Sequence, residues 1–337
     1  MSCGRLAGWL LVLPTALAWA PGAAARAADY AVTDSAWTGS MPKAVLLSPD
    51  GERAYVTNFG RRGSRNVSVY RTADLEEVGQ VDFAGNGVEM AVTGDGRTLY
   101  VSNFRRALVE IVDTASLTVT AEVPVGRNPK TMALSADEQT LYVSNWSSND
   151  VSVVDLATRT ETRRFRVGAH PRGIAVTEAG TLIVGNHADD TLSFLDAATG
   201  DPRFEPVGPG GCPRHVILSP DERWAYVSAQ STGQVVRLDA ATGEVVARWD
   251  GGRNLKTIDV TADGRYVFTT VNLGTEVGVI DTEDGTTRYF TVRGIEKPSG
   301  LDVTPDGKRV YVTGWLDCHL YVLERREPAP GEAPAAE

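Results

Sequence analysis

Five basic residues occupy equivalent places in a repeating sequence unit, and they are the first candidates for chemistry in this chain. Aligned across the repeats, the position after the residue that opens an apolar segment, which is usually a proline, holds Lys43, Lys130, Arg172, Arg214 and Lys256. Two further repeats have Val88 and Ser299 there. Ammonium and guanidinium groups around one opening bind anions through charge-assisted hydrogen bonds. These residues predict an anion-binding site; the alternative is that they are solvated charges that bind nothing.

Aromatic residues recur beside the same cations. Each repeat contains a Tyr-Val-Thr/Ser-Asn tetrapeptide or a degenerate copy of it, and the next residue is aromatic at Phe59, Phe104, Trp146 and Trp315. The other repeats have His187, Gln230 and Asn272. Flat rings interleaved with positive charge are typical of single-stranded nucleic-acid binding, where stacking contributes about 1–3 kcal/mol per base. The alternative is that these rings only pack against a neighbouring repeat.

Histidines and cysteines are the remaining candidates for binding a metal or a haem. The four histidines are His170, His187, His215 and His319. Neutral imidazole is a common metal ligand, but the chain has no H-E-x-x-H or C-x-x-C-H motif, and we expect no cofactor. Cys212 and Cys318 are the only cysteines after residue 27. An exported pair invites a disulfide, although residues two repeats apart can exceed the Cα separation of about 7 Å that a bridge allows.

Catalysis would need acids or nucleophiles that converge, and three acids are the candidates. Glu89 lies near the expected opening, and Asp259 and Asp302 have matching places in adjacent repeats. Two carboxylates that share a buried site can separate their pKa values and act as acid and base. More often such acids accept hydrogen bonds from buried backbone amides. The chain has no G-x-S-x-G motif, so we expect a binding protein rather than an enzyme and assign no catalytic residue.

The spacing of the tetrapeptides predicts the fold that must position these residues. Successive copies are 45, 42, 41, 43, 42 and 43 residues apart, and they lie at 55–58, 100–103, 142–145, 183–186, 226–229, 268–271 and 311–314. This period, carried by β-branched and aromatic residues, predicts an all-β, seven-bladed β-propeller of four-stranded antiparallel blades. The last repeat supplies only three strands, so we expect residues 29–37 to add its fourth and close the ring.

The tetrapeptide resembles the YVTN family of β-propeller repeats, within the WD40/YVTN repeat-like superfamily, which is found in secreted bacterial and archaeal surface-layer proteins. The resemblance covers about residues 42–324. Similar members include a periplasmic protein that binds single-stranded DNA, sugar-lactone hydrolases of related build, and haem-associated relatives. The resemblance therefore implies three alternatives: nucleic-acid binding, lactone hydrolysis, and an accessory role with haem or metal in a periplasmic redox pathway. One fold hosts many functions, so the site must decide between them.

The two ends of the chain differ from the repeats. Arg5, the apolar residues 6–20 and the small-residue site at 25–27 predict a secretory signal peptide over 1–27. We expect the propeller to occupy 28–326 and a disordered Pro/Ala-rich tail to occupy 327–337. The mature chain has no apolar run long enough to cross a bilayer. The sequence therefore predicts a periplasmic or secreted protein.

Strand direction assigns each loop to one of the two faces of the disc. The first face, with the five basic residues at its pore mouth, collects more cations than acids, although the formal net charge of the chain is −10. Such segregation predicts an anionic ligand or an acidic partner protein, with single-stranded nucleic acid as one form. The opposite face carries aspartates in its turns, where Asp bonds the backbone two residues on.

Overall fold

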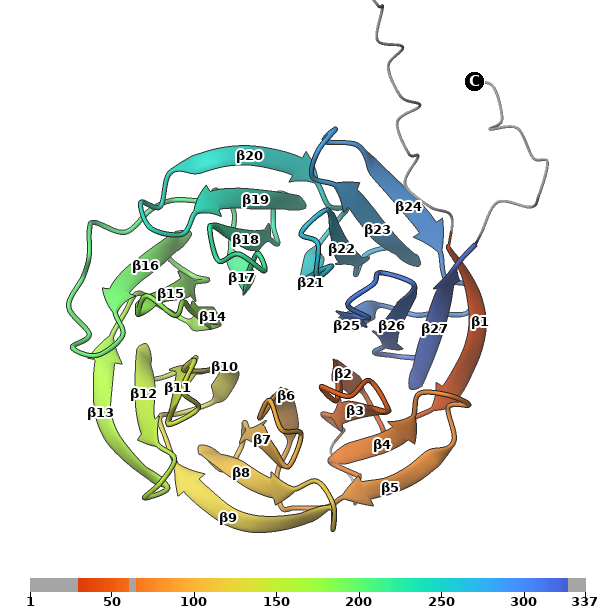
Figure 1. The fold of residues 1–337 in the computed structure, drawn as a ribbon, viewed down its shortest axis with the longest axis horizontal. Helices are drawn as coiled ribbons and strands as arrows, with labels where there is room; N and C mark the ends of the chain where they lie inside the picture. The colour runs from red at the N-terminus through yellow and green to blue at the C-terminus, as the bar shows by residue number, and fades with distance from the viewer. Residues whose placement is uncertain (1–29, 61–64, 327–337) are drawn as a thin grey trace, which may run out of the picture.

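The structure is a ring of seven antiparallel sheets, and it is a computed structural model that describes residues 30–60 and 65–326 (Figure 1). The described residues form 27 strands. The predicted signal peptide and the predicted C-terminal tail lie outside the described residues. The all-β, seven-bladed propeller predicted from the repeats is confirmed.

Each blade is ordered from the central channel outward. The innermost strands are β2 (Pro42–Leu47), β6 (Gly87–Val92), β10 (Pro129–Leu134), β14 (Pro171–Val176), β17 (Pro213–Leu218), β21 (Leu255–Val260) and β25 (Pro298–Val303). The second strands carry the tetrapeptides: β3 (Arg53–Asn58), β7 (Thr98–Asn103), β11 (Thr140–Asn145), β15 (Thr181–Asn186), β18 (Trp224–Ala229), β22 (Tyr266–Val271) and β26 (Arg309–Gly314).

The two outer positions of each blade complete the sheets. The third strands are β4 (Val67–Arg71), β8 (Leu108–Asp113), β12 (Asp150–Asp155), β16 (Thr191–Asp196), β19 (Gln234–Asp239), β23 (Glu276–Asp281) and β27 (His319–Arg325). The outermost strands are β5 (Glu77–Val81), β9 (Thr118–Pro124), β13 (Thr160–Arg166), β20 (Val245–Asp250), β24 (Thr287–Thr291) and β1 (Tyr30–Trp37).

The first described strand belongs to the last blade. β1 pairs with β27 in antiparallel register from Tyr30↔Arg325 to Trp37↔His319, and the sheet has the order β1-β27-β26-β25. Figure 1 shows these two strands side by side at the junction of the first and last blades. The two ends of the described chain are therefore held in one sheet.

The fourth blade has three strands rather than four. Its sheet is β14-β15-β16, and the outer place is taken by a segment that makes only isolated bridges, Leu192↔Val207 and Leu195↔Pro202. That segment contains three prolines between residues 202 and 209. Proline donates no ladder hydrogen bond, so a regular outer strand does not form.

The apolar core lies between the blades and explains the Tyr-Val pair of the tetrapeptide. Successive side chains of a strand point to opposite faces of its sheet. Tyr142 packs with Ile174 and other residues of the next blade, whereas Val143 packs with Val109 and others of the preceding blade. Both faces of each blade are therefore buried, which is why apolar residues are adjacent in sequence rather than alternating with polar ones.

The aspartates of the opposite face tighten turns. The hydroxyl of Ser48 donates to Asp50 at 2.5 Å, and the N–H of Glu52 donates to the same carboxylate at 3.0 Å. These bonds lower the pKa of Asp50, with the Ser48 hydroxyl the largest cause. The arrangement recurs at Asp137 and Asp221. Among residues 30–60 and 65–326, no helix is long and apolar enough to cross a membrane.

Candidate anion-binding site

The hydroxyl residue of the tetrapeptide positions the cations at the centre of the ring. Ser144 Oγ lies 2.6 Å from the carbonyl oxygen of Arg172 in the next blade and 3.0 Å from that of Thr131 in its own blade. Ser228 Oγ donates in the same way to the carbonyl oxygen of Lys256, at 2.9 Å. The innermost strands of adjacent blades are thereby tied at the residues that carry the charges.

A left-handed residue brings the cation and the aromatic of one blade together. Asn128 has a φ of 56° just before Pro129, and its carbonyl accepts the N–H of Trp146 at 3.1 Å. Asparagine is among the non-glycine residues that adopt this conformation most readily. Lys130, one residue beyond Pro129, therefore lies beside Trp146. His170 in the fourth blade and Lys297 in the seventh have the same left-handed conformation as Asn128, and their carbonyl groups accept the equivalent backbone N–H.

The predicted cations and aromatics are in contact across blade boundaries. Lys130 Nζ lies 4.2 Å from the ring centroid of Phe104 and 5.4 Å from that of Trp146. Arg172 Cζ lies 5.5 Å from the Trp146 centroid, and Lys256 Nζ lies 5.8 Å from that of Trp315. At these distances a cation is attracted to the ring quadrupole.

The aromatic rings also pack against one another. The Phe59 centroid lies 5.6 Å from that of Phe104 and 5.8 Å from that of Trp315. Trp146 stacks on His170, with centroids 4.5 Å apart and planes 15° apart. The rings of Trp315, Phe59 and Phe104 thus contact one another over the seventh, first and second blades, and Lys130 is close to both Phe104 and Trp146. Three of the four rings also contact a cation, so the two alternatives from the sequence are not exclusive.

Polar side chains complete the rim over the remaining blades. Gln230 Nε2 donates to Asn254 Oδ1 at 2.6 Å, and Asn254 Nδ2 donates to Asn272 Oδ1 at 2.9 Å. His187 Nε2 lies 3.0 Å from Gln230 Oε1, and Arg214 donates to the same oxygen at 3.3 Å. The sequence did not predict this chain of amides. The only signal was that Gln230 and Asn272 align with the aromatic positions, and Asn254 with the left-handed residue.

The five cations are largely buried and have little compensating charge. The side chains of Lys43 and Arg214 are 7% and 9% exposed, and Lys130, Arg172 and Lys256 are partly buried. Within the described residues, only one carboxylate forms a salt bridge with any of them: Glu89 Oε1 lies 3.6 Å from Lys43 Nζ. The mouth of the channel is therefore a concentrated and mostly unpaired positive site.

Burial and mutual repulsion shift the pKa of every cation downward. Burial lowers the pKa of Lys130 to about 6, and the Arg172 charge lowers it further. Burial also lowers the pKa of Lys256 to about 6, with the Arg214 charge as the next cause. The pKa of Arg172 falls to about 10, again because of burial. The pKa values of Lys43 and Arg214 fall well below their usual ranges for the same reason.

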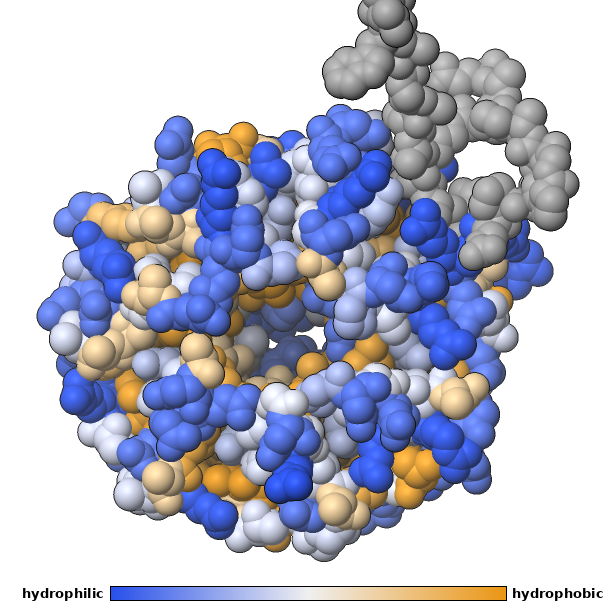
Figure 2. Space-filling model, in the orientation of Figure 1, coloured by the Kyte–Doolittle hydropathy of each residue, from blue (hydrophilic) through white to orange (hydrophobic). Residues whose placement is uncertain are grey.

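Below the cations, the central channel contains a cavity of about 230 Å³, and Figure 2 shows its opening at the centre of the disc. Residues of all seven innermost strands line it, including Glu89, His215, Asp259 and Asp302. The N–H groups of Val303 and Leu47, each on the next blade, donate to Asp259 at 2.8 Å and to Asp302 at 2.6 Å. These two acids thus accept hydrogen bonds from buried backbone amides, which was the alternative to catalysis that the sequence offered.

The histidines do not form one cluster. His170 and His187 both contact Trp146 at the rim, and His215 Nδ1 lies 3.0 Å from the carbonyl oxygen of Ile258 in the channel. His319 belongs to β27, where Nδ1 lies 2.7 Å from the carbonyl oxygen of Asp317. Residues 30–60 and 65–326 contain no group of three or more His, Cys, Asp or Glu that could hold a metal.

The two cysteines do not form the disulfide that the sequence left open. Cys212 and Cys318 are both free thiols.

Two of the loop arginines on the positive face are paired with acids. Arg65 lies 2.6 Å from Glu77, and Arg106 lies 2.5 Å from Glu122. Both acids lie on outermost strands, so these two arginines add less to the positive charge of this face than the sequence alone indicates.

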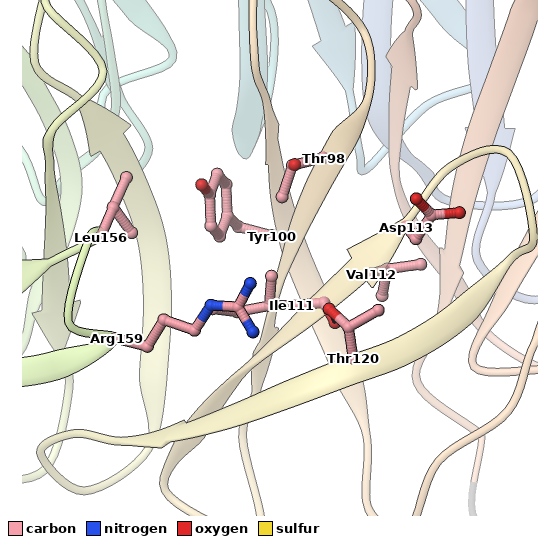
Figure 3. A pocket seen from close by; sticks show the side chains of 8 residues that line it. All are labelled: Thr98, Tyr100, Ile111, Val112, Asp113, Thr120, Leu156 and Arg159. Atoms are coloured by element: carbon pink, nitrogen blue, oxygen red, sulfur yellow. Dashed lines mark hydrogen bonds between the residues drawn. The ribbon is translucent and has the colours of Figure 1, made fainter.

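A second cavity of about 300 Å³ lies between the second and third blades, away from the cations. Figure 3 shows its lining, which includes Thr98, Tyr100 and Arg159. In the first and seventh blades the position of Thr98 holds Arg53 and Arg309, whose guanidinium groups donate to carbonyls of the next blade. The threonine is too short to make this contact, and the space stays open.

Comparisons with known proteins agree with the fold. The sequence matches the YNCE-like beta-propeller family over residues 22–179. It is 28% identical over 136 residues to Antigen Lp49 of Leptospira interrogans serogroup Icterohaemorrhagiae serovar copenhageni (strain Fiocruz L1-130), a match that covers 36% of this chain and 30% of that protein. The chain thus spans less than a third of that relative.

A solved structure is similar over most of the ring. A chain of Kuenenia stuttgartiensis Hydrazine Synthase superposes with a TM-score of 0.74, over 84% of this chain and 95% of that chain, at 20% sequence identity. At this identity the likeness concerns the fold alone. The seven in-phase tetrapeptides, the ring of seven blades and the family match over residues 22–179 together show a β-propeller built from YVTN-type repeats.

Proposed function

We propose that this propeller is a binding module whose basic, aromatic-edged pore mouth binds an anionic ligand or the acidic group of a partner protein. The observation that carries the proposal is positive charge with little compensation: five basic residues from five blades meet at one opening, and among residues 30–60 and 65–326 only one carboxylate, that of Glu89, forms a salt bridge with any of them. A buried charge without a partner costs several kcal/mol, so an anion that enters this site is strongly favoured.

The placement of this charge supports specific rather than general attraction. The chain has a formal net charge of −10, so its overall field repels anions. Only a local concentration of cations, supported by low-dielectric walls and aromatic rings, attracts an anion to such a protein. The hydrogen bonds of Ser144 and Ser228 fix the backbone that carries the cations, which keeps the site preorganised.

The candidate acids support binding rather than hydrolysis. Glu89 is paired with Lys43, and Asp259 and Asp302 accept hydrogen bonds from backbone amides of the next blade. A hydrolase needs an acid or nucleophile that is free to act on its substrate. We therefore rank lactone hydrolysis, and a haem- or metal-associated role, below anion binding.

We also propose that the protein is exported to the periplasm or secreted, because the sequence of residues 1–27 has the charge, apolar stretch and small-residue site of a signal peptide. N-terminal sequencing of the protein from a periplasmic or culture fraction tests this. A mature chain that starts at Ala28 supports export, and an intact N-terminus on cytoplasmic protein contradicts it.

Anion binding is tested by the intrinsic fluorescence of the purified protein, because Trp146 and Trp315 contact the cations. A mixed panel of anions is titrated: sulfate, pyrophosphate, citrate and a short oligothymidylate. At least one should change the fluorescence saturably, with an affinity that falls as salt rises. Arg97→Gln is the matched control, because this arginine is 85% exposed and lies in a turn of the opposite face. If no anion binds, or if binding ignores salt, the proposal fails.

A further inference from the structure

We infer that the ligand of this pore mouth is a compact oxyanion with several negative charges, such as a polyphosphate or polycarboxylate, and not an extended single-stranded nucleic acid. This inference rests on the proposed function, because it names the class of anion that the same site takes. Four features of the described residues carry it: the convergence of the cations, the occupied faces of the aromatic rings, the small size of the channel below the mouth, and the surplus of positive charge.

The cations converge on one another instead of following a groove. Lys130 Nζ and Arg172 Cζ, from adjacent blades, lie 5.4 and 5.5 Å from the centroid of the same ring, that of Trp146. The charges of Lys130, Arg172 and Arg214 also lower the pKa of Lys43 in the first blade, and the charge of Lys43 lowers the pKa of Lys256 in the sixth. A strand of nucleic acid is held by charges spread along its backbone. Charges from five blades that act on one another around one opening instead fit a small anion at the centre.

The aromatic rings have few faces left for stacking. Lys130 lies over the ring of Phe104, and the ring of Trp146 contacts both Lys130 and Arg172 while it stacks on His170. Base stacking requires an open aromatic face. These rings are engaged with the cations and with neighbouring blades, so they support the cations and are not a platform for bases.

The channel below the mouth is small, and its lining contains acids but none of the five cations. Its volume is about 230 Å³, below the roughly 300–1,000 Å³ of pockets that hold drug-sized molecules. Gly173 and Gly300 lie one residue beyond the cation position, and a Cβ there would come within 2.7 Å of the Val216 nitrogen and 2.6 Å of Ala44 Cα, so adjacent innermost strands are closely packed. A long anionic chain is therefore not drawn into the channel, and the anion binds at the mouth itself.

The charge of the site matches an anion with several charges. Five cations with one paired carboxylate leave a surplus of four positive charges when all are protonated. The guanidinium groups of Arg172 and Arg214 can each bind two oxygen atoms of one phosphate or carboxylate group. Phosphate and carboxylate ligands share this chemistry, and separate probes distinguish them.

Isothermal titration of the full mature chain tests the inference, with pyrophosphate, citrate and an oligothymidylate of about twelve nucleotides as probes near pH 6 and at low salt. Pyrophosphate or citrate should bind with one site per chain and more tightly than the oligonucleotide. Tighter binding of pyrophosphate assigns the phosphate class, and tighter binding of citrate assigns the carboxylate class. Arg172→Gln should weaken this binding about ten- to a hundredfold, and Arg97→Gln should leave it unchanged.

Two outcomes overturn the inference and separate it from the proposed function. If the oligonucleotide binds and the compact anions do not, the compact-ligand inference is wrong while anion binding stands. If none of the probes binds, both are wrong. Should Arg172→Gln fail to fold, Lys256→Gln removes a charge from a different blade; equal pyrophosphate and citrate affinities for this variant and the wild type would also contradict the inference.

Discussion

The hydroxyl oxygen of Ser144 lies 2.6 Å from the carbonyl oxygen of Arg172, so a serine of the third blade fixes the backbone of a cationic residue in the fourth. This single contact links the repeat to the site. The tetrapeptide is a signature of the fold, and its third residue also fixes the backbone position of the pore cations. The same arrangement recurs where Ser228 bonds the carbonyl oxygen of Lys256.

Ser144→Ala should therefore affect both stability and binding. The variant leaves a buried carbonyl oxygen without its donor, which costs about 1–3 kcal/mol of unfolding free energy. It also releases the backbone of Arg172, so anion affinity should fall. Urea denaturation and a titration with pyrophosphate measure the two effects. Ser144→Thr is the matched control, because Thr57 and Thr313 occupy this position in other blades. A fully stable Ser144→Ala protein would remove the proposed role of this hydrogen bond.

Anion affinity should depend on pH because two pore lysines have a pKa of about 6 in the empty site. An anion stabilises their protonated forms, so binding takes up protons above pH 6. The affinity should be full below pH 6 and should fall as pH rises to 8, by up to about tenfold per pH unit for each lysine. The other charged groups that act on these two lysines are Glu89, Lys43, Arg172, Arg214 and Lys297.

Trimetaphosphate is the probe for this pH series, because its own charge stays constant over the range. Lys256→Arg is the matched variant: arginine keeps its charge, so the slope of affinity against pH should become shallower. Calorimetry in two buffers of different ionisation enthalpy reports the protons taken up. A flat affinity between pH 6 and pH 8 would show that these lysines do not titrate in the empty site.

The stability of the empty protein should change with pH in the opposite direction. In the unfolded chain a lysine keeps its proton up to about pH 10, whereas in the folded protein Lys130 and Lys256 lose theirs near pH 6. Between these values the unfolded state binds more protons, so the free energy of unfolding rises with pH. Urea denaturation from pH 6 to pH 9 measures this rise. It should be smaller in a Lys130→Met variant, and an identical slope would count against the pKa shift.

The Asp259–Asp302 pair predicts a different pH effect at the junction of the sixth and seventh blades. Burial and the neighbouring Asp259 raise the pKa of Asp302 well above its usual range. The unfolded chain releases this proton above about pH 4, so the pair reduces stability progressively as pH rises above that value. Asp302→Asn removes the repulsion and should flatten the dependence, making the variant relatively more stable at pH 8 than at pH 4.

Asp302→Ala separates this charge effect from the hydrogen bond. The alanine variant leaves the N–H of Leu47 without its acceptor, so at every pH it should be about 1–3 kcal/mol less stable than Asp302→Asn, which keeps an acceptor oxygen. Thermal unfolding of both variants across the pH range gives the comparison. If Asp302→Asn shows the same pH slope as the wild type, the two carboxylates do not share a proton in the folded protein.

Glu110 is a buried acid that the repeat does not require. It is fully buried, one carboxylate oxygen accepts from Asn103 Nδ2 at 2.8 Å, and the other has no hydrogen-bond partner. Serines stand at this position in other blades, for example Ser152. Burial raises the pKa of Glu110, so its ionisation reduces stability above the unfolded pKa of about 4.3. Glu110→Gln should be about 1 kcal/mol more stable than the wild type at pH 8 and similar at pH 4. Greater wild-type stability at pH 8 would contradict this.

The repeat predicted most of the fold because it reports a local rule used seven times. The tetrapeptides at 100–103 and 142–145, for example, form the last residues of β7 and β11. The three-stranded fourth blade was not predicted, because its repeat has the usual length and only its prolines prevent the outer strand. The spacing of the repeats does not reveal the missing strand, because it depends on the number of residues and not on how many of them can donate a backbone hydrogen bond.

The alignment predicted which residues lie near the opening, but it did not predict which of them are in contact. The alignment placed Lys130 and Trp146 near one opening, and the structure brings them to 5.4 Å. The alignment did not predict that Arg172 would also lie near the ring of Trp146. Nor did it predict the hydrogen bond between Gln230 and Asn254. Such contacts cross blade boundaries and depend on side-chain length and rotamer, which leave no periodic signal in the sequence.

A crystal structure of the protein soaked with tungstate tests the central claim most directly, because this compact oxyanion scatters strongly. The account predicts a tungsten peak at the channel mouth, with its oxygen atoms within hydrogen-bonding distance, about 3 Å, of the guanidinium groups of Arg172 and Arg214. A mouth that holds no anion, with tungstate bound only at outer loops, would contradict it.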